Sequence, residues 1–397
     1  MMNKTLDLLK FSAAMACAAI LAFGSATHAD TFTGLGDGTS WEDPANWLAG
    51  VVPLNNSSPI IIFADHNVEF DAGTWAALTA SGNLQNATEH RIARLLMGDT
   101  TAGTANGTHS LTMDQGAGNT VRATNGTSAV FGSRPGKFST LNLVSGITNI
   151  EAGRFRVGQG ADSSATINLN GGELILGRGG LELASIDGSG GDGTLNIFGG
   201  RFLTRNDVEI FNGGVFNVEG SVASEIGIGT EGSTDGRWVQ EVGGVLRLGF
   251  DAGGVTTILI DEIDGVPGTG GDGTATFAAG SILDLVNLGG FNTTGFVTVM
   301  TAEGGITGAP TLSPASVAAG WQMQIVGNDL QVQSPGGVGP VLKGDVNLDG
   351  GVTFLDINPF ILLLASNGFQ AEADCDCDGD LDFLDIQPFI NILANGP

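Results

Sequence analysis

The fold is decided by the stretch Ile167-Asn-Leu-Asn-Gly-Gly172-Glu-Leu-Ile-Leu-Gly177, in which apolar and polar residues alternate on both sides of a glycine pair. Alternation with period two predicts two short β-strands, and the glycines predict a tight turn between them. Similar six-residue phrases begin at Leu111, Leu141, Leu195, Phe216 and Val239, with successive starts 21 to 30 residues apart. Each unit is therefore predicted to be a strand, a turn and a strand.

Repeats of this length cannot bury an apolar face alone, so they predict a stacked solenoid in which each turn of chain covers its neighbour. Because each unit carries only β signals, the best prediction is a mainly β protein with a parallel β-helix body over residues 111–250. The repeated Asn predicts a ladder of stacked side-chain amides. The uneven spacing leaves the register open, and an antiparallel sandwich stays as the alternative.

The regions beside the repeats are predicted to be β caps. Residues 30–110 contain Trp41-Glu-Asp-Pro-Ala-Asn46-Trp47, where the Trp pair is expected to cover the first turn of the solenoid and Asp43 or Asn46 to close a turn. Stacking of the Trp rings on a glycan is the alternative. Residues 251–333 keep the β alternation without the repeated phrase, since the end of a solenoid must differ from its middle. Residues 334–342 are then predicted to be a linker.

The composition limits the class of protein. The chain has 65 Gly, no Tyr, 15 Lys plus Arg and 42 Asp plus Glu, with a net charge of −27. Such an acidic chain is a poor partner for nucleic acid, whose phosphates need basic patches. Residues 1–29 combine two Lys, a short apolar segment and Thr27-His28-Ala29, which predicts a signal peptide, a secreted or cell-surface protein and no membrane span.

Two acidic loops near the C-terminus share a calcium-binding pattern. They are Asp345-Val-Asn-Leu-Asp-Gly-Gly-Val-Thr-Phe-Leu-Asp356 and Asp374-Cys-Asp-Cys-Asp-Gly-Asp-Leu-Asp-Phe-Leu-Asp385, 29 residues apart. Oxygen-bearing side chains at positions 1, 3, 5 and 12, with glycine at position 6, form the loop pattern of the EF-hand. Two Ca²⁺ ions are predicted, with backbone carbonyls at position 7 and water bridges at position 9. The predicted ligands are Asp345, Asn347, Asp349, Gly351, Thr353, Asp356, Asp374, Asp376, Asp378, Asp380, Asp382 and Asp385.

A helix is predicted after each loop, over residues 354–365 and 383–394, from apolar residues at helical spacing and a proline near each first turn. Cys375 and Cys377 are too close in sequence for a good internal disulfide. Zinc would need about two further soft ligands. Calcium is therefore favoured over zinc, and metal binding is expected to supply much of the folding free energy of residues 343–397.

The paired loop-and-helix units resemble type I dockerin modules over residues 343–397. This resemblance implies a calcium-folded module that binds a cohesin-like protein module on a scaffold or cell surface. Carried over by position, it implies partner contacts at Phe354, Leu355, Phe383 and Leu384, where dockerins often have hydroxyl residues instead. The alternative is that Phe354 and Phe383 pack between the two helices.

The β region also resembles known families, but less specifically. Residues 111–250 resemble the autotransporter-associated β-strand repeats of bacterial surface proteins, and the Trp41–Trp47 segment resembles the opening of secreted planctomycete-type β proteins. Both resemblances imply an exported scaffold and name no reaction.

The predicted function is calcium-dependent docking of a non-catalytic β-solenoid used for surface adhesion or scaffolding. The alternative is a polysaccharide-degrading enzyme with an attached dockerin, because dockerins often accompany glycoside hydrolases and β-helices often carry lyases. Glycosidic cleavage needs two carboxylates at a defined separation. Glu173, Glu182, Asp207 and Glu209 are candidates, but they lie in different repeats without a local motif, and Arg154 and Arg156 are expected to be solvated. No catalytic residue is therefore predicted.

Overall fold

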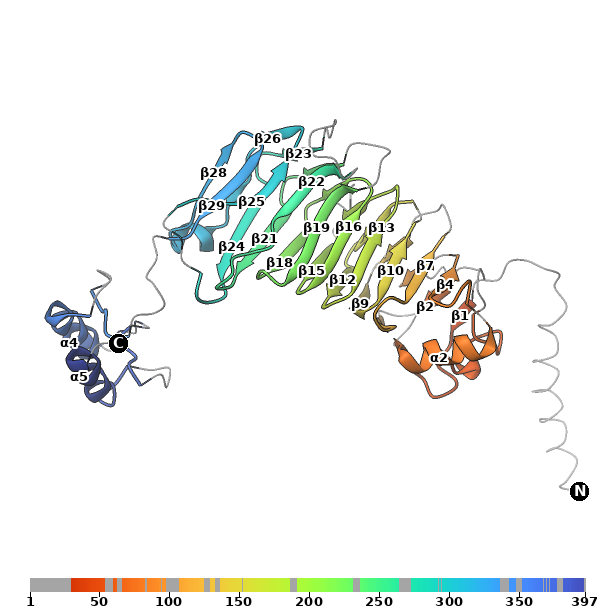
Figure 1. Cartoon of the computed structure of the whole chain (residues 1–397), viewed down its shortest axis with the longest axis horizontal. Coiled ribbons are helices and arrows are strands. Elements are labelled where there is room, and N and C mark those ends of the chain that lie inside the picture. Colours follow the sequence, from red (N-terminus) through yellow and green to blue (C-terminus); the bar gives the residue numbers. More distant parts are fainter. Residues whose placement is uncertain are drawn as a thin grey trace, which may run out of the picture.

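The chain is mainly β and contains a parallel β-solenoid, as the computed structural model shows (Figure 1). The predicted signal peptide and the loop residues Asp349, Gly351, Asp378 and Asp380 lie outside the described residues, as does most of the predicted linker. The structure describes residues 30–397 except 54–59, 63–65, 83, 94, 98–106, 125–128, 133–135, 152, 186–190, 231–235, 264–272, 292, 294, 336–342, 348–351, 367, 369, 371, 377–380 and 396–397.

Three sheets form the solenoid, and each turn of chain adds one strand to each sheet. Sheet A contains β1 (Asp30–Phe32), β2 (Ile60–Ile62), β5 (Leu95–Met97), β8 (Ala129–Phe131), β11 (Phe155–Val157), β14 (Leu181–Leu183), β17 (Val208–Ile210), β20 (Arg237–Gln240), β23 (Thr274–Phe277) and β26 (Gly305–Gly308). Sheet B contains β3 (Asn67–Phe70), β6 (Gly107–Asp114), β9 (Lys137–Ser145), β12 (Ser164–Leu169), β15 (Asp192–Ile197), β18 (Gly214–Glu219), β21 (Val245–Phe250), β24 (Ile282–Asn287) and β27 (Thr311–Leu312). Sheet C contains β4 (Glu89–Ile92), β7 (Thr120–Ala123), β10 (Ile147–Ile150), β13 (Glu173–Leu176), β16 (Gly200–Thr204), β19 (Ala223–Thr230), β22 (Ile258–Ile263), β25 (Val297–Ala302), β29 (Asp329–Gln333) and β28 (Gln322–Val326).

One stack of apolar residues fixes the register of sheet B. Leu141, Ile167 and Leu195 are direct neighbours on β9, β12 and β15, and all three are fully buried. Burial of such a side chain contributes about 1.5–3 kcal/mol, so a slip by one residue, which would turn the whole stack to solvent, is strongly disfavoured. The pairing is parallel, which confirms the predicted solenoid and excludes the antiparallel sandwich for this region.

The sixth phrase, which begins at Val239, does not lie in the same sheet as the other five. Val239 lies on β20 of sheet A, opposite Glu209, whereas Leu246 on β21 is the neighbour of Phe216 in sheet B. The two segments look alike because strands of all three sheets share the same alternation. The solenoid is also longer than the predicted repeats, since parallel pairs such as β1 with β2 and β24 with β27 lie outside residues 111–250.

Glycine recurs in the repeated six-residue phrase because other residues do not fit at one corner of the solenoid. Gly146, Gly172 and Gly200 have φ values of 76°, 66° and 73°, in the left-handed region that favours glycine. A Cβ atom on Gly172 would lie 2.4 Å from the carbonyl oxygen of Gly146, and one on Gly200 would lie 2.4 Å from that of Gly172. Successive turns of chain therefore approach closely at this corner, and a side chain there would separate them.

Asparagine recurs because it forms the predicted amide ladder on the outer side of sheet B. The Nδ2 atom of Asn168 donates to Oδ1 of Asn142 at 2.9 Å, and Asn196 donates to Asn168 at 2.9 Å. Asn217 continues the ladder by donating to Asn196 at 3.0 Å. The ladder joins four successive turns of chain, which confirms this prediction.

The N-terminal end of the solenoid is closed by aromatic side chains. Trp41 and Trp47 are 1% and 3% exposed and pack edge to face with ring centroids 4.9 Å apart. Asn46, in the short 3₁₀ helix η1 (Pro44–Asn46), accepts hydrogen bonds from the amides of Gly36 and Gly38. These contacts confirm the capping role of the Trp pair, and its burial excludes the glycan platform.

The two C-terminal helices were predicted, whereas helices α2 and α3 of the β body were not. Helix α2 (Ala72–Ser81) was missed, although Asp71 and Thr74 form a capping box and Gly82 ends the helix with φ 70°. Helix α3 (Pro314–Ala318) precedes β28 and β29 at the other end, where β29 pairs antiparallel with β25 and β28. Both predicted C-terminal helices are present, as η2 (Phe354–Asp356) with α4 (Ile357–Ser366) and as α5 (Ile386–Asn395).

Candidate metal centre

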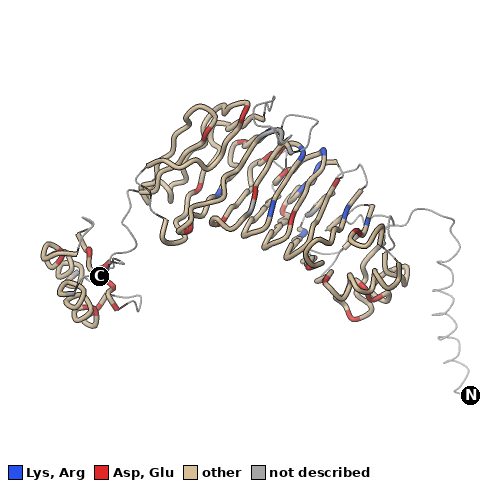
Figure 2. The backbone as a smooth tube through the Cα atoms, in the orientation of Figure 1, with Lys and Arg blue, Asp and Glu red and all other residues tan. Residues whose placement is uncertain are grey.

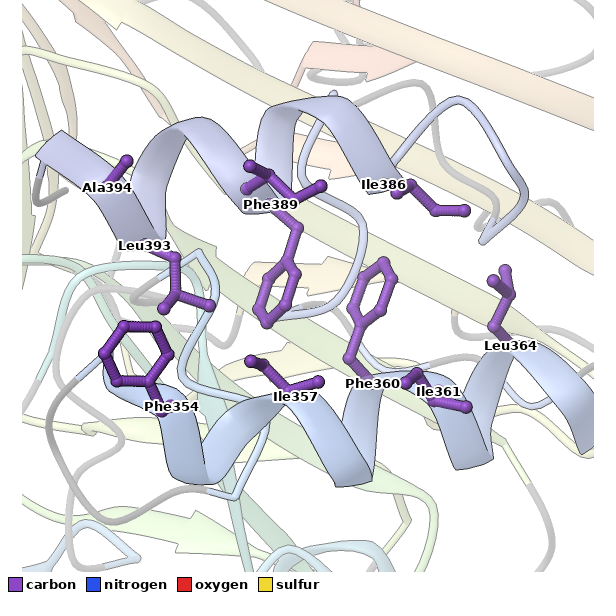
Figure 3. A pocket seen from close by; sticks show the side chains of 10 residues that line it. Phe354, Ile357, Phe360, Ile361, Leu364, Ile386, Phe389, Leu393 and Ala394 are labelled. Carbon is purple, nitrogen blue, oxygen red and sulfur yellow. The ribbon is translucent and has the colours of Figure 1, made fainter.

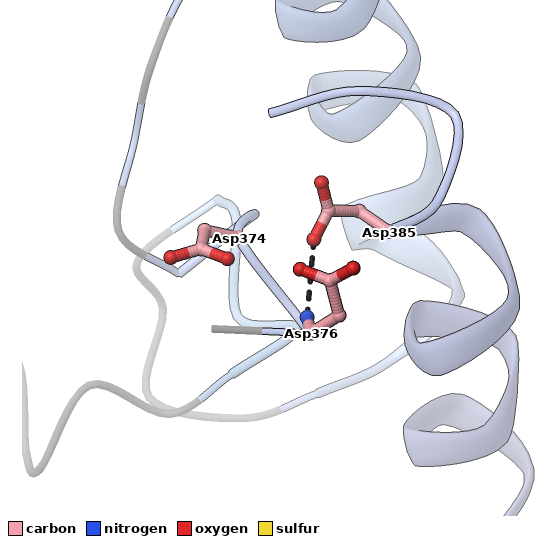
Figure 4. A group of neighbouring side chains, drawn as sticks. All are labelled: Asp374, Asp376 and Asp385. Atoms are coloured by element: carbon pink, nitrogen blue, oxygen red, sulfur yellow. Dashed lines mark hydrogen bonds between the residues drawn. The ribbon is translucent and has the colours of Figure 1, made fainter. Parts of the chain in front are cut away.

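Three carboxylates meet at the start of α5. Asp374 and Asp376 come from the second acidic loop, and Asp385 directly precedes the helix. One oxygen atom of each side chain lies within 4.8 Å of those of the other two (Figure 4). Hard oxygen donors at this separation fit a hard cation such as Ca²⁺. The chain folds this way locally because the turn before α5 brings both ends of the loop together.

Asp385 ties the second loop to its helix. Its buried carboxylate accepts hydrogen bonds from the backbone amides of Cys375 and Asp376 at 2.6 and 3.1 Å on one oxygen. The other oxygen accepts from the amide of Asp382 at 3.0 Å. A carboxylate that accepts several N–H donors is held in one orientation.

The first loop repeats this arrangement with different residues. Asp356 is also buried, and its two oxygens accept from the amides of Asn347 and Thr353 at 2.9 and 2.8 Å. The Thr353 hydroxyl accepts from the amide of Leu355 at 3.1 Å, so this side chain caps the helix start. The two loops therefore share the hydrogen bonds of their last carboxylate as well as their sequence pattern.

One buried atom in the second loop tests whether a cation fits there. Asp374 is 6% exposed, and its Oδ1 atom has no hydrogen-bond partner among the described residues. Its Oδ2 atom lies 3.4 Å from Nζ of Lys343, the nearest compensating charge. A buried carboxylate oxygen without a donor is costly, and a cation would remove that cost. The Cys375 thiol contacts the carbonyl of Glu372 at 3.6 Å, so the donors gathered here are oxygens, which fits calcium better than zinc.

At loop positions 1, 3, 5 and 12, the first loop has one carboxylate fewer than the second. Asp345 is 2% exposed and Asp356 is fully buried, but Asn347 stands where the second loop has Asp376. Of the predicted ligands, the structure describes Asp345, Asn347, Thr353, Asp356, Asp374, Asp376, Asp382 and Asp385. Among these, it brings Asp374, Asp376 and Asp385 together as carboxylates. Asp382, like Thr353, caps its helix, because it accepts from the amide of Leu384 at 2.6 Å.

The two helices pack through equivalent phenylalanines. The rings of Phe360 and Phe389 are parallel within 3°, with centroids 4.2 Å apart (Figure 3). Both rings are 3% exposed, and Val346 and Ala373 complete the small core. The core therefore joins each helix to the acidic loops, so that loop geometry and helix packing depend on one another.

The four predicted partner-contact residues lie at the surface. Phe354 and Phe383 are 80% and 79% exposed, and Leu355 and Leu384 are 69% and 64% exposed. The alternative, in which Phe354 and Phe383 pack between the helices, is wrong, since Phe360 and Phe389 occupy that place. Phe354 lies at one end of an apolar groove of about 580 Å³ along both helices (Figure 3). The remaining groove residues are Ile357, Phe360, Ile361, Leu364, Ile386, Phe389, Ile390, Leu393 and Ala394.

Stacking of the solenoid turns also brings together charged residues that are far apart in the sequence (Figure 2). Glu182 and Glu209 are direct neighbours on β14 and β17 of sheet A. Arg154 bridges them, since its Nη1 atom contacts Glu182 and lies 2.9 Å from Glu209. Arg156 contacts Glu182 at 2.9 Å. The two arginines are therefore ion-paired with carboxylates, while their side chains stay 37% exposed and partly solvated, as expected.

The other two candidate carboxylates have separate partners. Asp207 is 5% exposed and pairs with Arg237, whose Nε atom donates to it at 3.2 Å. Glu173 lies on sheet C, where it is 3.4 Å from Arg201. Sequence reasoning missed the grouping of Glu182, Glu209 and Asp207 because these residues are 25 to 27 positions apart between turns and meet only when the turns stack.

No family model matches this chain, and no curated protein or solved structure matches it either. Within the described part of the chain, no helix has both the length and the apolar character needed to cross a bilayer. The proposals below therefore depend on the geometry of this chain.

Proposed function

We propose that the C-terminal segment is a dockerin-like module that binds two Ca²⁺ ions and docks the β-solenoid to a cohesin-like protein module. The supporting observation is the repeated loop geometry, in which Asp356 and Asp385 make equivalent hydrogen bonds 29 residues apart. The solenoid then serves as an exported, non-catalytic scaffold or adhesion element at the cell surface.

The metal-binding part of the proposal rests on charge. Asp374, Asp376 and Asp385 place three carboxylates around one point, with Lys343 as the nearby cation. Bound Ca²⁺ would supply positive charge that offsets the repulsion between these carboxylates. In the first loop, Asp345, Asn347 and Asp356 would act in the same way with a lower total charge. Loop closure would then hold α4 and α5 in the packed arrangement.

The docking part of the proposal rests on exposed apolar side chains. Phe354 with Leu355 and Phe383 with Leu384 form two equivalent apolar pairs, one at the start of each helix. Large aromatic side chains that are mostly exposed are uncommon on an isolated surface and are enriched among the residues that dominate protein interfaces. The two pairs therefore form the surface that we expect a partner to cover.

The test measures binding of the full chain to a panel of purified cohesin modules, with excess calcium or excess chelator. We expect at least one cohesin to bind only with calcium, and the double variant Phe354→Ala/Phe383→Ala to bind it at least tenfold more weakly, which corresponds to about 1.4 kcal/mol. Phe138→Ala is the matched control, because Phe138 is a partly exposed phenylalanine of the solenoid. Equal binding in calcium and chelator, or no binding to any cohesin, would refute the proposal.

A further inference from the structure

A second candidate site lies on the outer side of sheet A, away from the acidic loops. A groove of about 500 Å³ runs across the ends of β14, β17 and β20. Three successive turns of the solenoid supply it, because Ser185 follows β14, Asn212 follows β17 and Glu241 follows β20. Its residues are Ser185, Glu209, Phe211, Asn212, Arg237, Val239, Glu241 and Val242.

The groove combines apolar surface with both kinds of hydrogen-bonding group. Phe211, Val239 and Val242 supply the apolar surface, and Val242 is 60% exposed. Arg237 and Asn212 supply donors, while carboxylate and amide oxygens supply acceptors. Since parallel strands stand about 4.8 Å apart, these groups recur at a spacing comparable to one sugar unit of a linear glycan.

We propose that this groove binds a neutral oligosaccharide. Sugar hydroxyls both donate and accept hydrogen bonds, so they match a wall that offers both. The C–H faces of sugar rings are apolar and match Phe211, Val239 and Val242. Ligands of this class need a mostly pre-formed concave surface with a few fixed polar groups, which a rigid stack of strands provides.

Local charge favours a neutral ligand over an anionic one. Glu209 and Glu241 line the groove, and the guanidinium of Arg237 is already paired with Asp207. Arg154 is likewise held between Glu182 and Glu209. The basic side chains at this face are thus neutralised by the protein's own carboxylates, and a polyanion would meet uncompensated negative charge.

Burial and the neighbouring Arg154 act in opposite directions on the pKa of the Glu209 carboxyl group. Burial raises the pKa of its carboxyl group, the charge of Arg154 opposes this rise, and the charges of Glu182 and Asp207 add to it. Arg154 holds this carboxylate in place, and its oxygens can accept hydrogen bonds from sugar hydroxyls.

The test uses affinity electrophoresis and calorimetry of the full chain with soluble polysaccharides. The neutral arm contains mixed-linkage β-glucan, xyloglucan, galactomannan and arabinoxylan, and the anionic arm contains polygalacturonate and alginate. We expect binding to at least one neutral glycan, unchanged by chelator, because the groove does not involve the acidic loops. Asn212→Ala and Val242→Asp should each weaken binding about tenfold through a lost hydrogen bond or an added charge.

Asn170→Ala is the matched control, since Asn170 is an exposed asparagine that follows β12 on sheet B, and its binding should equal that of the unmodified chain. Binding to none of the neutral glycans would overturn the proposal. Tighter binding to the anionic glycans would also overturn it. Equal affinities of Asn212→Ala, Val242→Asp and Asn170→Ala for the neutral glycan would do so as well. Release of new reducing ends would contradict a groove that only binds. Docking should be lost in chelator and glycan binding should not, so failure of one does not imply failure of the other.

Discussion

Position 3 of the acidic loops offers a direct test of the proposed metal sites. Asp376→Asn gives the second loop the residue type that the first loop has as Asn347, and Asn347→Asp makes the reverse change. In the second loop, carboxylate oxygens of Asp374, Asp376 and Asp385 lie within 4.8 Å of one another. The swap therefore adds or removes one negative charge and leaves the shape of the side chain almost unchanged.

The magnitude follows from Coulomb's law. Two like charges about 4 Å apart repel by about 4 kcal/mol at an effective dielectric constant of about 20. Asp376 is exposed, so solvent and salt reduce its repulsion with the neighbouring carboxylates to about 1 kcal/mol. Without calcium, Asp376→Asn should therefore stabilise the second loop by about 1 kcal/mol. With calcium, it should weaken binding at this loop about tenfold, since calcium affinity rises with the charge of the ligands.

Two signals in the full chain separate the module from the solenoid. All five Trp residues precede residue 322 and the chain has no Tyr, so Trp fluorescence follows the β body. The helical band of the circular dichroism spectrum includes α2 and α3 of the β body as well as α4 and α5, so its calcium-dependent part reports on the module. Calcium titration by calorimetry gives the affinity of each loop, and thermal unfolding in chelator gives the stability without metal.

For each variant, the change in stability without calcium and the change in calcium affinity should have opposite signs. Asp376→Asn should raise the stability without calcium and lower the affinity for calcium, and Asn347→Asp should do the reverse at the first loop. Asp162→Asn is the control, because it removes one charge at an exposed position of the solenoid where the left-handed φ of 55° also suits Asn. Unchanged affinity, or changes of the same sign in both measurements, would refute a charge-controlled site.

Three further predictions concern the whole chain. Excess chelator is expected to unfold residues 343–397 and leave the solenoid intact, because metal binding supplies much of the folding free energy of so small a module; an unchanged helical signal and unchanged proteolysis would contradict this. Asn196→Ala removes two ladder hydrogen bonds and should destabilise the solenoid by about 2 kcal/mol in urea unfolding, against about 0.5 kcal/mol or less for the outward-facing control Thr194→Ala; equal effects would argue against a structural ladder. The raised pKa of Glu209 means that the folded state is favoured by protonation and loses this contribution as the pH rises through the folded pKa; Glu209→Gln should therefore increase the melting temperature near pH 7 more than near pH 4, and a pH-independent change would contradict it.

Local sequence predicted the repeating structure well. The phrase from Ile167 to Gly177 contains both strands and the glycine corner, and its asparagine lies in the ladder between Asn142 and Asn196. The proline and the apolar spacing after each acidic loop predicted α4 and α5. These features depend on residues that are close in sequence, where period and turn chemistry act directly.

Features that depend on register were harder to predict. The segment at Val239 has the same alternation as a sheet B strand, and only its pairing with Glu209 shows that it belongs to sheet A. Glu182 and Glu209 become neighbours only when successive turns align. Helix α2 had a readable capping box at Asp71, but its apolar residues do not follow one stripe, so periodicity gave no signal.

The in-register stack of apolar residues in sheet B implies that the solenoid can change length only in whole turns. Twenty-six residues separate Leu141 from Ile167, 21 separate Leu195 from Phe216, and 30 separate Phe216 from Leu246, yet each pair stands side by side. The differences are absorbed at the corners. Duplication or loss of one full turn would lengthen or shorten the body by about 4.8 Å and preserve the remaining pairs. The length of such a solenoid can therefore change in evolution by one turn at a time.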